Sequence, residues 1–324
     1  MGKDIAERPI VGVDVGGTNI TAGLIDPRNK IVAREKTDTK PDGGTEKVVE
    51  RIADCVKAVV KDSDYAKGDL GAVGLGVPGA VEADSGLVLE AVNLRWTNVP
   101  LAELLGKALD VPVVVDNDVN VGTWGEYRAG AGEGAKGLLG IFVGTGIGGG
   151  LVLDGKLYTG AFGSAGEVGH TVLNARGAFG DRSLEQMASR SAVVNRLVGL
   201  VESNHPSKLR ELAGDKWPRV RSKPLAKALA ADDELTIRVL REAAFAVGIA
   251  IANTVTLLSL DRVVVGGGLT EALDDRWMQW IREAFDDAVF PAVCRQCTLQ
   301  ASALEDDAGL LGAALLARER TQDG

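Results

Sequence analysis

One device occurs twice in this chain: an apolar strand that runs into a glycine turn and continues as a second strand. The first copy is VGVDVGGTNITAGLID, which begins at Val11, and the second is GIFVGTGIGGGLVLDG, which begins at Gly140. The two copies begin more than a hundred residues apart along the chain. Repetition of a strand–turn–strand hairpin at this separation indicates two related half-molecules that face each other across a cleft.

Strands and helices alternate along the rest of the chain. Apolar residues recur with helical spacing over 46–60, and the continuous apolar run over 111–115 is typical of a strand buried on both faces. Further strands are expected over 71–77, 138–143 and 262–265, and further helices over 101–109, 243–260 and 307–318. The alternation predicts an α/β fold with mixed sheets.

Composition argues against several classes of partner. The formal net charge of −9 repels nucleic acid and anionic membranes, so neither is expected to bind. Three cysteines cannot form a disulfide framework, which favours a reducing compartment, and Cys294 and Cys297 are interpreted as incidental thiols. The short polar segment before Ile10 predicts no signal peptide. The uncharged stretch 243–260 contains Asn, Thr and Ser, which favours a helix buried in a soluble domain over a membrane span.

The first glycine turn has the features of a phosphate-binding loop. A strand delivers Asp14 into the turn that holds Gly16, Gly17, Thr18 and Asn19. Glycines let backbone N–H groups approach phosphate oxygens, Thr18 can add a hydroxyl donor, and Asp14 can hold a water bound to Mg²⁺. The alternative interpretation is a plain β-hairpin.

The second turn, Gly144-Thr145-Gly146, forms the same kind of cradle. The segment after this turn is strand-like, whereas a helix comes after the dinucleotide-binding G-x-G-x-x-G motif, and no Gly-Lys-Ser/Thr ends the turn as in a Walker A loop. We therefore interpret it as a second phosphate loop.

Two polar clusters are candidates for the chemistry. Asn117 and Asp118 follow the buried strand 111–115, and ligands of α/β sheets gather at the carboxyl ends of strands. Asp118 can accept a hydroxyl proton there as the hydroxyl attacks a γ-phosphate, although a turn that caps the next helix is the alternative. Glu167 and His170 form a pair that can grip vicinal hydroxyls, although a lone histidine is more often structural.

Together these motifs resemble the ROK family of sugar kinases over essentially the whole chain. The matching set is Asp14-Val-Gly-Gly-Thr18, Gly76-Val-Pro-Gly79, Asn93-Leu94, Asn117-Asp118, Gly144-Thr-Gly-Ile-Gly148, Glu167-Val-Gly-His170 and Val265-Gly-Gly-Gly268. The resemblance implies the actin/hexokinase/Hsp70-like fold, an α/β architecture of two ribonuclease-H-like domains around an ATP cleft. The expected domains are residues 1–118 plus 305–324, which form the smaller N-terminal domain, and 119–304, which form the larger C-terminal domain.

The resemblance also implies roles for individual residues. Asp118 matches the catalytic base. The residues that match sugar contacts are Gly79, Asn93, Asn117, Glu167, His170 and Glu185. The residues that match the nucleotide side are Asp14, Gly16, Gly17, Thr18, Asn19, Gly144, Thr145 and Gly146, with Gly266, Gly267 and Gly268 on the adenosine side. The implied cofactors are ATP and Mg²⁺, with Asp14 as a Mg²⁺ ligand through water, and the implied assembly is a homodimer.

The chain departs from the family pattern between His170 and Glu185. Many members carry Cys-x-Cys-Gly-x-x-Gly-Cys there and bind structural zinc, whereas this chain has RGAFGDRS over 176–183. A structural zinc needs about four N or S ligands. We therefore predict no zinc, and we expect Phe179 packing and an Arg–Asp pair to hold the loop instead.

The predicted activity is ATP-dependent phosphorylation of a hexose primary hydroxyl in the cytoplasm, with glucose as the first choice of sugar and glucose 6-phosphate as the product. Kinases for fructose, mannose, N-acetylglucosamine or N-acetylmannosamine share the pocket motif and stay open, as does a non-catalytic sugar sensor. Repressors of the same family carry a DNA-binding domain before the first loop, where this chain has nine residues ahead of Ile10. The glycines on the adenosine side favour ATP over polyphosphate as the phosphoryl donor.

Overall fold

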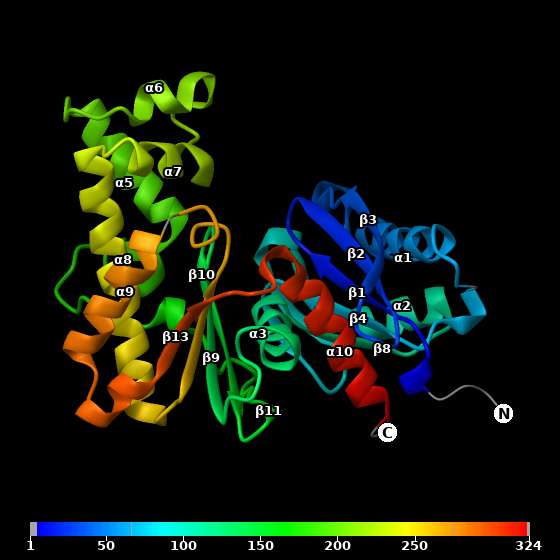
Figure 1. The fold of residues 1–324 in the computed structure, drawn as a ribbon. Helices are drawn as coiled ribbons and strands as arrows, with labels where there is room; N and C mark the ends of the chain where they lie inside the picture. Colours follow the sequence, from blue (N-terminus) through cyan, green and yellow to red (C-terminus); the bar gives the residue numbers. More distant parts are fainter. Residues whose placement is uncertain (1–4, 66, 274, 323–324) are drawn as a thin grey trace. The chain divides into compact units, whose positions relative to one another are not determined.

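The computed structural model describes residues 5–65, 67–273 and 275–322. The chain forms two compact units. Unit 1 comprises Met1–Glu133, Leu157–Ala165 and Asp306–Gly324, and unit 2 comprises Gly134–Lys156 and Gly166–Glu305. Each unit combines strands and helices, as the ribbon in Figure 1 shows.

The strands are β1 (Ile10–Val15), β2 (Asn19–Ile25), β3 (Ile31–Asp38), β4 (Val73–Val77), β5 (Ala80–Glu82), β6 (Leu87–Ala91), β7 (Trp96–Pro100), β8 (Val113–Asn117), β9 (Gly137–Val143), β10 (Ile147–Leu153), β11 (Lys156–Leu157), β12 (Arg262–Gly266) and β13 (Thr298–Ala301). The α-helices are α1 (Thr45–Lys61), α2 (Leu101–Leu109), α3 (Asp118–Ala129), α4 (Leu184–Ala188), α5 (Arg190–Glu202), α6 (Leu209–Ala213), α7 (Ser222–Ala230), α8 (Glu234–Leu258), α9 (Asp275–Ala288) and α10 (Ala308–Gln322). The predicted helices and strands are confirmed, most of them with small shifts at their ends.

Two five-stranded sheets follow one plan. The first has the order β3-β2-β1-β4-β8, in which β2 is antiparallel to β1, and β4 is parallel to both β1 and β8. The second has the order β11-β10-β9-β12-β13, in which β10 is antiparallel to β9, and β12 is parallel to both β9 and β13. The hairpins β1–β2 and β9–β10 are the two glycine-turned devices, so the prediction of two related halves is confirmed.

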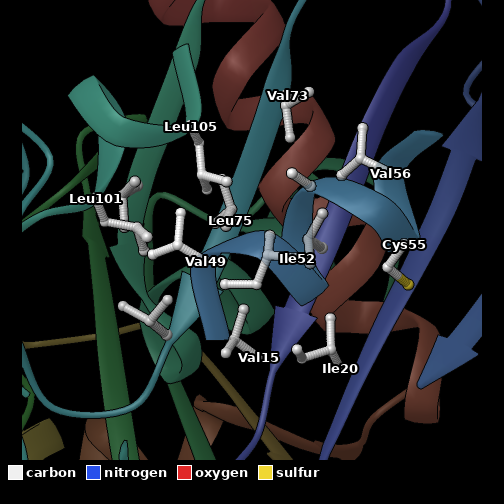
Figure 2. Close-up of a cluster of buried hydrophobic side chains, with 14 of the residues drawn as sticks. Val15, Ile20, Val49, Ile52, Cys55, Val56, Val73, Leu75, Leu101 and Leu105 are labelled. Carbon is white, nitrogen blue, oxygen red and sulfur yellow. The ribbon is translucent and has the colours of Figure 1, made fainter. Parts of the chain in front are cut away.

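A continuous hydrophobic core fills one side of the unit 1 sheet. Helix α1 buries the apolar face that the spacing over 46–60 predicts, including Val49, Ile52 and Val56. These side chains meet Leu75 from β4 and Leu105 from α2, as Figure 2 shows. Helical spacing in α1 and buried β-branched residues in the strands therefore converge on the same core.

Helix α10 packs against the unit 1 sheet with its backbone close to the strands. A methyl group on Gly12 of β1 would lie 1.9 Å from the carbonyl oxygen of Leu310, and one on Gly74 of β4 would lie 1.9 Å from that of Ala313. Helix α3 is equally close, because a methyl group on Gly312 would lie 1.7 Å from the carbonyl oxygen of Val121. Glycines at these contacts let the helix approach without a Cβ in the way.

Two features of the fold differ from expectation. The predicted strand 111–115 is β8, which begins two residues later and ends at Asn117. Pro112 has no N–H to donate to a sheet, so the ladder begins after it. The expected domain boundary at residue 118 assigns α3 to the C-terminal domain, whereas α3 packs on α10 within unit 1.

The uncharged stretch 243–260 forms the last 16 residues of α8 and the two residues after it, and the side chains of Ala244, Val247, Ile251 and Val255 there are buried. This confirms the predicted buried helix. Among the helices that the structure describes, none combines the length and apolar content that a membrane span needs.

The contact between α10 and β4 leads to a prediction about stability. Replacement of Gly74 by Ala should lower the free energy of unfolding by about 2 kcal/mol or more, because the added methyl overlaps the Ala313 carbonyl and forces the helix outward. Urea unfolding measures the change. Gly106→Ala in α2 is the matched control, since its methyl would meet its nearest neighbour at 3.7 Å. The control should be neutral or stabilising by about 0.5 kcal/mol, and an equal loss in both variants would contradict the prediction.

Candidate active site

The turn between β8 and α3 carries two of the predicted site residues. Asn117 caps α3, and its side-chain oxygen accepts the N–H groups of Val119 at 2.9 Å and Asn120 at 3.1 Å. Its amide nitrogen donates to the carbonyl oxygen of Gly79 at 3.0 Å. Gly79 has φ +102, and a methyl group there would lie 2.0 Å from the Glu90 carbonyl oxygen, which explains the glycine. The predicted sugar residues Asn117 and Gly79 are thus in direct contact.

Two carboxylates lie at the carboxyl ends of β1 and β8. Asp14 is the fifth residue of β1 and pairs with Gly76 of the parallel strand β4. Asp118 is the first residue of α3, is half-buried, and its Oδ1 accepts the N–H of Val119 at 2.9 Å. A methyl group on Gly76 would lie 3.2 Å from the Asp118 Cα, so the glycine lets the Asp118 backbone approach β4.

The environment raises the pKa of the Asp14 carboxyl from 3.8 to about 6. The largest cause is burial by the surrounding protein, followed by the charges of Asp118 and Asp306, and Lys36 acts in the opposite direction. Asp14 is nevertheless exposed to solvent. The repulsion by Asp118 and Asp306 raises its pKa even where burial is incomplete. Nearby like charges make the ionised form costly, and a bound cation would relieve that cost.

The first glycine loop is held through its carbonyl oxygens. The N–H of Gly16 donates to the Asn19 carbonyl at 2.9 Å and closes the turn. The fully buried Thr39 donates from its hydroxyl to the Gly16 carbonyl at 2.6 Å and from its N–H to the Thr18 carbonyl at 2.9 Å. Among the residues that the structure describes, the N–H groups of Gly17 and Thr18 have no hydrogen-bond acceptor. Unpaired N–H groups of this kind are donors for an anion.

Asn93 lies beside this loop. It belongs to the short 3₁₀-helix η4 (Val92–Leu94) and is exposed. A methyl group on Gly17 would lie 3.1 Å from its Cβ. At the carboxyl ends of β1, β4 and β8, or beside them, unit 1 therefore gathers Asp14, Gly16, Gly17, Thr18, Asn19, Gly79, Asn93, Asn117 and Asp118.

The second glycine loop is held in the same manner in unit 2. The N–H of Gly144 donates to the Gly146 carbonyl at 2.9 Å, and the N–H of Arg190 donates to the Gly144 carbonyl at 2.9 Å. The Ser191 hydroxyl donates to the Thr145 carbonyl at 2.7 Å, and the Arg190 guanidinium donates to the Thr145 hydroxyl. Within the described part of the chain, the N–H groups of Thr145 and Gly146 have no acceptor. Both loops therefore bind their carbonyl oxygens to the protein and leave N–H groups available.

Glu185 contacts the second loop directly. Its Oε2 accepts the N–H of Ile147 at 2.8 Å, and a methyl group on Gly146 would lie 2.3 Å from the same oxygen. Helix α4, which carries Glu185, begins with a capping box formed by Ser183 and Gln186. The structure thus connects this predicted sugar residue to the loop that is predicted to bind phosphate.

Glu167 immediately precedes the 3₁₀-helix η5 (Val168–His170), His170 is its last residue, and both residues are exposed. This turn packs tightly on β10, because a methyl group on Gly169 would lie 2.0 Å from the Ile147 carbonyl oxygen. The N–H of Leu184 donates to the Thr171 carbonyl at 3.0 Å, which brings α4 alongside. Glu167, His170 and Glu185 therefore come from adjoining turns of unit 2.

The three glycines at the end of β12 lie next to β9. Gly267 has φ +87, and a methyl group there would lie 2.7 Å from the backbone nitrogen of Val143. The N–H of Leu269 donates to the Val143 carbonyl at 3.0 Å, one residue before the second loop. Gly268 lines a pocket of about 540 Å³ together with Lys223 and Lys227 from α7. The glycines predicted for the adenosine side thus border both a cavity and the second loop.

Sequence analysis did not find the residues that hold the two loops, namely Thr39, Arg190 and Ser191. Each lies more than twenty residues from the loop it holds, so no local pattern reveals it. Burial, and then the charge of Arg221, lower the pKa of the Arg190 guanidinium. The Arg190 cation beside a loop with available N–H groups favours an anionic ligand.

The loop before α4 is held differently from expectation. Phe179 is 97% exposed, so it does not pack in a core, and the described residues contain no Arg–Asp ion pair within this loop. Instead, the Arg182 guanidinium donates to the carbonyls of Gly177 at 3.0 Å and Ala175 at 3.5 Å and lies 5.3 Å from the centre of the Phe179 ring. An arginine has several donors in a fixed plane, so it can bridge two carbonyls where a carboxylate cannot.

The raised pKa of Asp14 leads to a prediction about pH. The folded chain binds this proton more tightly than the unfolded chain, so ionisation of Asp14 destabilises the fold as the pH rises from 3.8 to about 6. The stability of Asp14→Asn relative to the wild type should therefore increase over that window and stay constant at higher pH. Urea unfolding at a series of pH values measures this difference. A difference that does not change with pH would contradict the assignment.

The contacts of Arg182 lead to a prediction about the loop. Arg182→Gln should accelerate amide hydrogen exchange over 174–183, because both carbonyl contacts and the ring contact are lost, while global stability falls by about 1 kcal/mol or less. Hydrogen exchange with mass spectrometry measures the effect. Arg176→Gln removes an exposed arginine of the same loop and is the matched control. Equal exchange in the two variants would show that Arg182 does not hold the loop.

The chain is similar to known proteins over nearly its whole length. The model of the ROK family matches residues 10–320. A glucokinase of Halalkalibacterium halodurans is 34% identical over 321 residues, which cover 98% of this chain and 97% of that protein. A xylose repressor of Caldicellulosiruptor bescii is 30% identical and covers 96% of this chain and 78% of that protein.

The structural comparison extends over the same length. The crystal structure of a ROK family glucokinase from Streptomyces griseus, in complex with glucose and AMPPNP, superposes with a TM-score of 0.82 at 32% identity, over 96% of this chain and 99% of that one. The fold is therefore the mixed α/β actin/hexokinase-like fold of ROK kinases, with two sheet-based domains. The family match and the near full-length relatives together show that this chain belongs to the ROK family.

Proposed function

We propose that the protein is a cytoplasmic, ATP-dependent hexose kinase that transfers the γ-phosphoryl group to the primary hydroxyl of glucose. The observation that carries the proposal is the pair of carboxylates at the carboxyl ends of β1 and β8. Asp118 stands at the start of α3 as a candidate base, and the raised pKa of Asp14 favours a cation beside it. A base and a cation site are the two parts that phosphoryl transfer to a hydroxyl needs.

The relatives support the choice of sugar and nucleotide. The Halalkalibacterium protein is named a glucokinase, and the Streptomyces griseus structure holds glucose and an ATP analogue. In this chain the N–H groups of Gly17, Thr18, Thr145 and Gly146 are available as donors for phosphate oxygens. The pocket beside Gly268 carries Lys223 and Lys227 together with Glu271, and the excess of positive charge favours a nucleotide. We therefore assign the adenosine side to Gly266, Gly267 and Gly268.

In the proposed mechanism Asp118 acts as general base. Its carboxylate accepts the proton of the primary hydroxyl while that oxygen forms a bond to the γ-phosphorus and the bond from the γ-phosphorus to the leaving oxygen breaks. We assign sugar contacts to Gly79, Asn93 and Asn117 of unit 1 and to Glu167, His170 and Glu185 of unit 2. Charged groups suit a polyol because each hydroxyl both donates and accepts a hydrogen bond.

The carboxylates fit a magnesium ion that arrives with the nucleotide. Mg²⁺ keeps several waters and uses one or two carboxylates together with substrate phosphates. Asp14 would hold it through a water, and the ion would neutralise phosphate charge during transfer. Among the described residues, no group of three or more His, Cys, Asp or Glu side chains could hold a metal ion by itself, without ligands from the nucleotide and water. That the protein holds no structural zinc is still a prediction, and elemental analysis of the purified protein tests it.

A non-catalytic sugar sensor is the second candidate, because a xylose repressor is among the relatives. Release of ADP from Mg-ATP in the presence of sugar separates the two functions. The first panel is glucose, mannose, fructose, N-acetylglucosamine and N-acetylmannosamine. Preference for glucose supports the full proposal. Preference for another hexose supports the kinase activity and changes only the assigned sugar. A homodimer is part of the same proposal, and sedimentation equilibrium tests it.

Asp118→Asn tests the assignment of the base. The variant should fold normally and lose about 10²–10⁴-fold in kcat, because an amide cannot accept the hydroxyl proton. Steady-state kinetics with glucose and Mg-ATP measure the loss. Asp110→Asn is the control: it changes an exposed aspartate at the end of α2, where φ +60 suits asparagine. Turnover near that of the wild type in Asp118→Asn would show that another group is the base.

A further inference from the structure

One buried carboxylate in unit 1 has no place in the proposed mechanism. Asp116 lies at the carboxyl end of β8, and its side chain is 2% exposed. Its Oδ1 accepts the backbone N–H of Asn117 at 2.8 Å and the side-chain amide of Asn120 at 3.0 Å. These two donors lie immediately before and two residues after Asp118, so the Asp116 carboxylate holds the turn on both sides of the candidate base.

The partner of Asp116 comes from the end of the chain. Arg320 of α10 donates from Nη2 to the other carboxylate oxygen of Asp116 at 2.8 Å. Its Nη1 also donates to the carbonyl of Ala83 at 3.4 Å, just after strand β5. Strand β5 begins next to Gly79, whose carbonyl accepts from Asn117. One arginine thus connects α10, the β8–α3 turn and the segment that follows Gly79.

The Asp116–Arg320 ion pair affects the orientation of its neighbours more than the stability of the fold. A buried ion pair contributes little net stability compared with well-packed apolar side chains of similar volume. The residues of β8 that precede Asp116 are valines, so the carboxylate departs from the apolar character of the strand. Unlike an apolar side chain, the Asp116 carboxylate holds two hydrogen-bond donors and one cation in defined directions.

We propose that Asp116 and Arg320 form a positioning pair through which helix α10 sets the orientation of the Asp118 carboxylate. The proposal rests on the proposed role of Asp118 as base. Without Arg320 the Asp116 carboxylate would be buried without a cation and would shift toward water, and its bonds to Asn117 and Asn120 would weaken. A displacement of about 1 Å at a reacting group can cost up to about 10²-fold in rate.

Two variants test the pair with different effects on stability. Arg320→Met should lower kcat about 10- to 100-fold and also lower the thermal midpoint, because the Asp116 charge is left unpaired. Asp116→Leu/Arg320→Met removes the unpaired charge and should recover only part of the thermal midpoint that Arg320→Met loses, because the Asn117 and Asn120 donors lose their acceptor, while kcat stays low. The KM for ATP should change by less than about twofold in both variants, because the bonds to the turn act on the base and not on nucleotide binding. Recovery of kcat together with stability in the double variant would overturn the proposal.

Glu319→Gln is the matched control. It breaks the ion pair of 2.6 Å between Glu319 and Arg128, which joins α10 to the last turn of α3. This variant should keep the kcat of the wild type. Arg320→Lys retains the charge but cannot donate to both Asp116 and the Ala83 carbonyl from one plane. Its kcat should therefore lie between those of the wild type and Arg320→Met. A loss of kcat in Glu319→Gln equal to that in Arg320→Met would overturn a specific role for the pair.

A second measurement does not depend on turnover. The backbone N–H of Asn117 donates to Asp116. Hydrogen exchange of this backbone amide, measured by NMR, should accelerate about tenfold or more in Arg320→Met and should not change in Glu319→Gln. Unchanged exchange at Asn117 would overturn the pairing. Loss of the proposed function has a different signature: the wild type would show no sugar-dependent ADP release, or Asp118→Asn would turn over normally, while the exchange at Asn117 still responds to Arg320.

Discussion

The close approach of α10 to the unit 1 sheet is the contact on which the candidate site depends. Glycines of β1 and β4 let carbonyl oxygens of the helix reach positions where a Cβ would overlap them. The helix can then cross the sheet from β1 to β8, as Figure 1 shows in red, and its last turns place Arg320 on Asp116. The same helix contacts α3, which begins with Asp118. In the proposal made above, packing of small residues therefore sets the position of a candidate catalytic group.

The two glycine loops show how one physical solution is built twice from different residues. In each loop the first glycine N–H donates to a carbonyl at the end of the turn, and more distant groups occupy further carbonyl oxygens. In unit 1 the distant residue is Thr39, and in unit 2 it is Arg190 together with Ser191. The carbonyls are satisfied within the protein, and among the described residues the remaining loop N–H groups have no acceptor, which suits a phosphate.

Local patterns predicted the parts of the fold that have local causes. The glycine-turned hairpins, the amphipathic face of α1 and the buried strands follow from side-chain periodicity and turn chemistry, and the structure contains all of them. The prediction for β8 was off by two residues because continuous apolar character does not register the missing N–H of Pro112. The expectation for the loop before α4 was wrong in its chemistry, because a search for charge pairs overlooks an arginine that binds carbonyl oxygens.

By itself the sequence determined the repeated hairpin plan, the order of strands and helices, and the identity of the polar residues at strand ends, since these depend on neighbours along the chain. The tertiary structure alone decided which distant groups hold those residues: Thr39 on the first loop, Glu185 on the second, and Arg320 on the turn before Asp118. The physical reason is that hydrogen bonds and ion pairs between distant segments depend on orientation and burial. A sequence of residue types does not specify either until the backbone has brought the segments together.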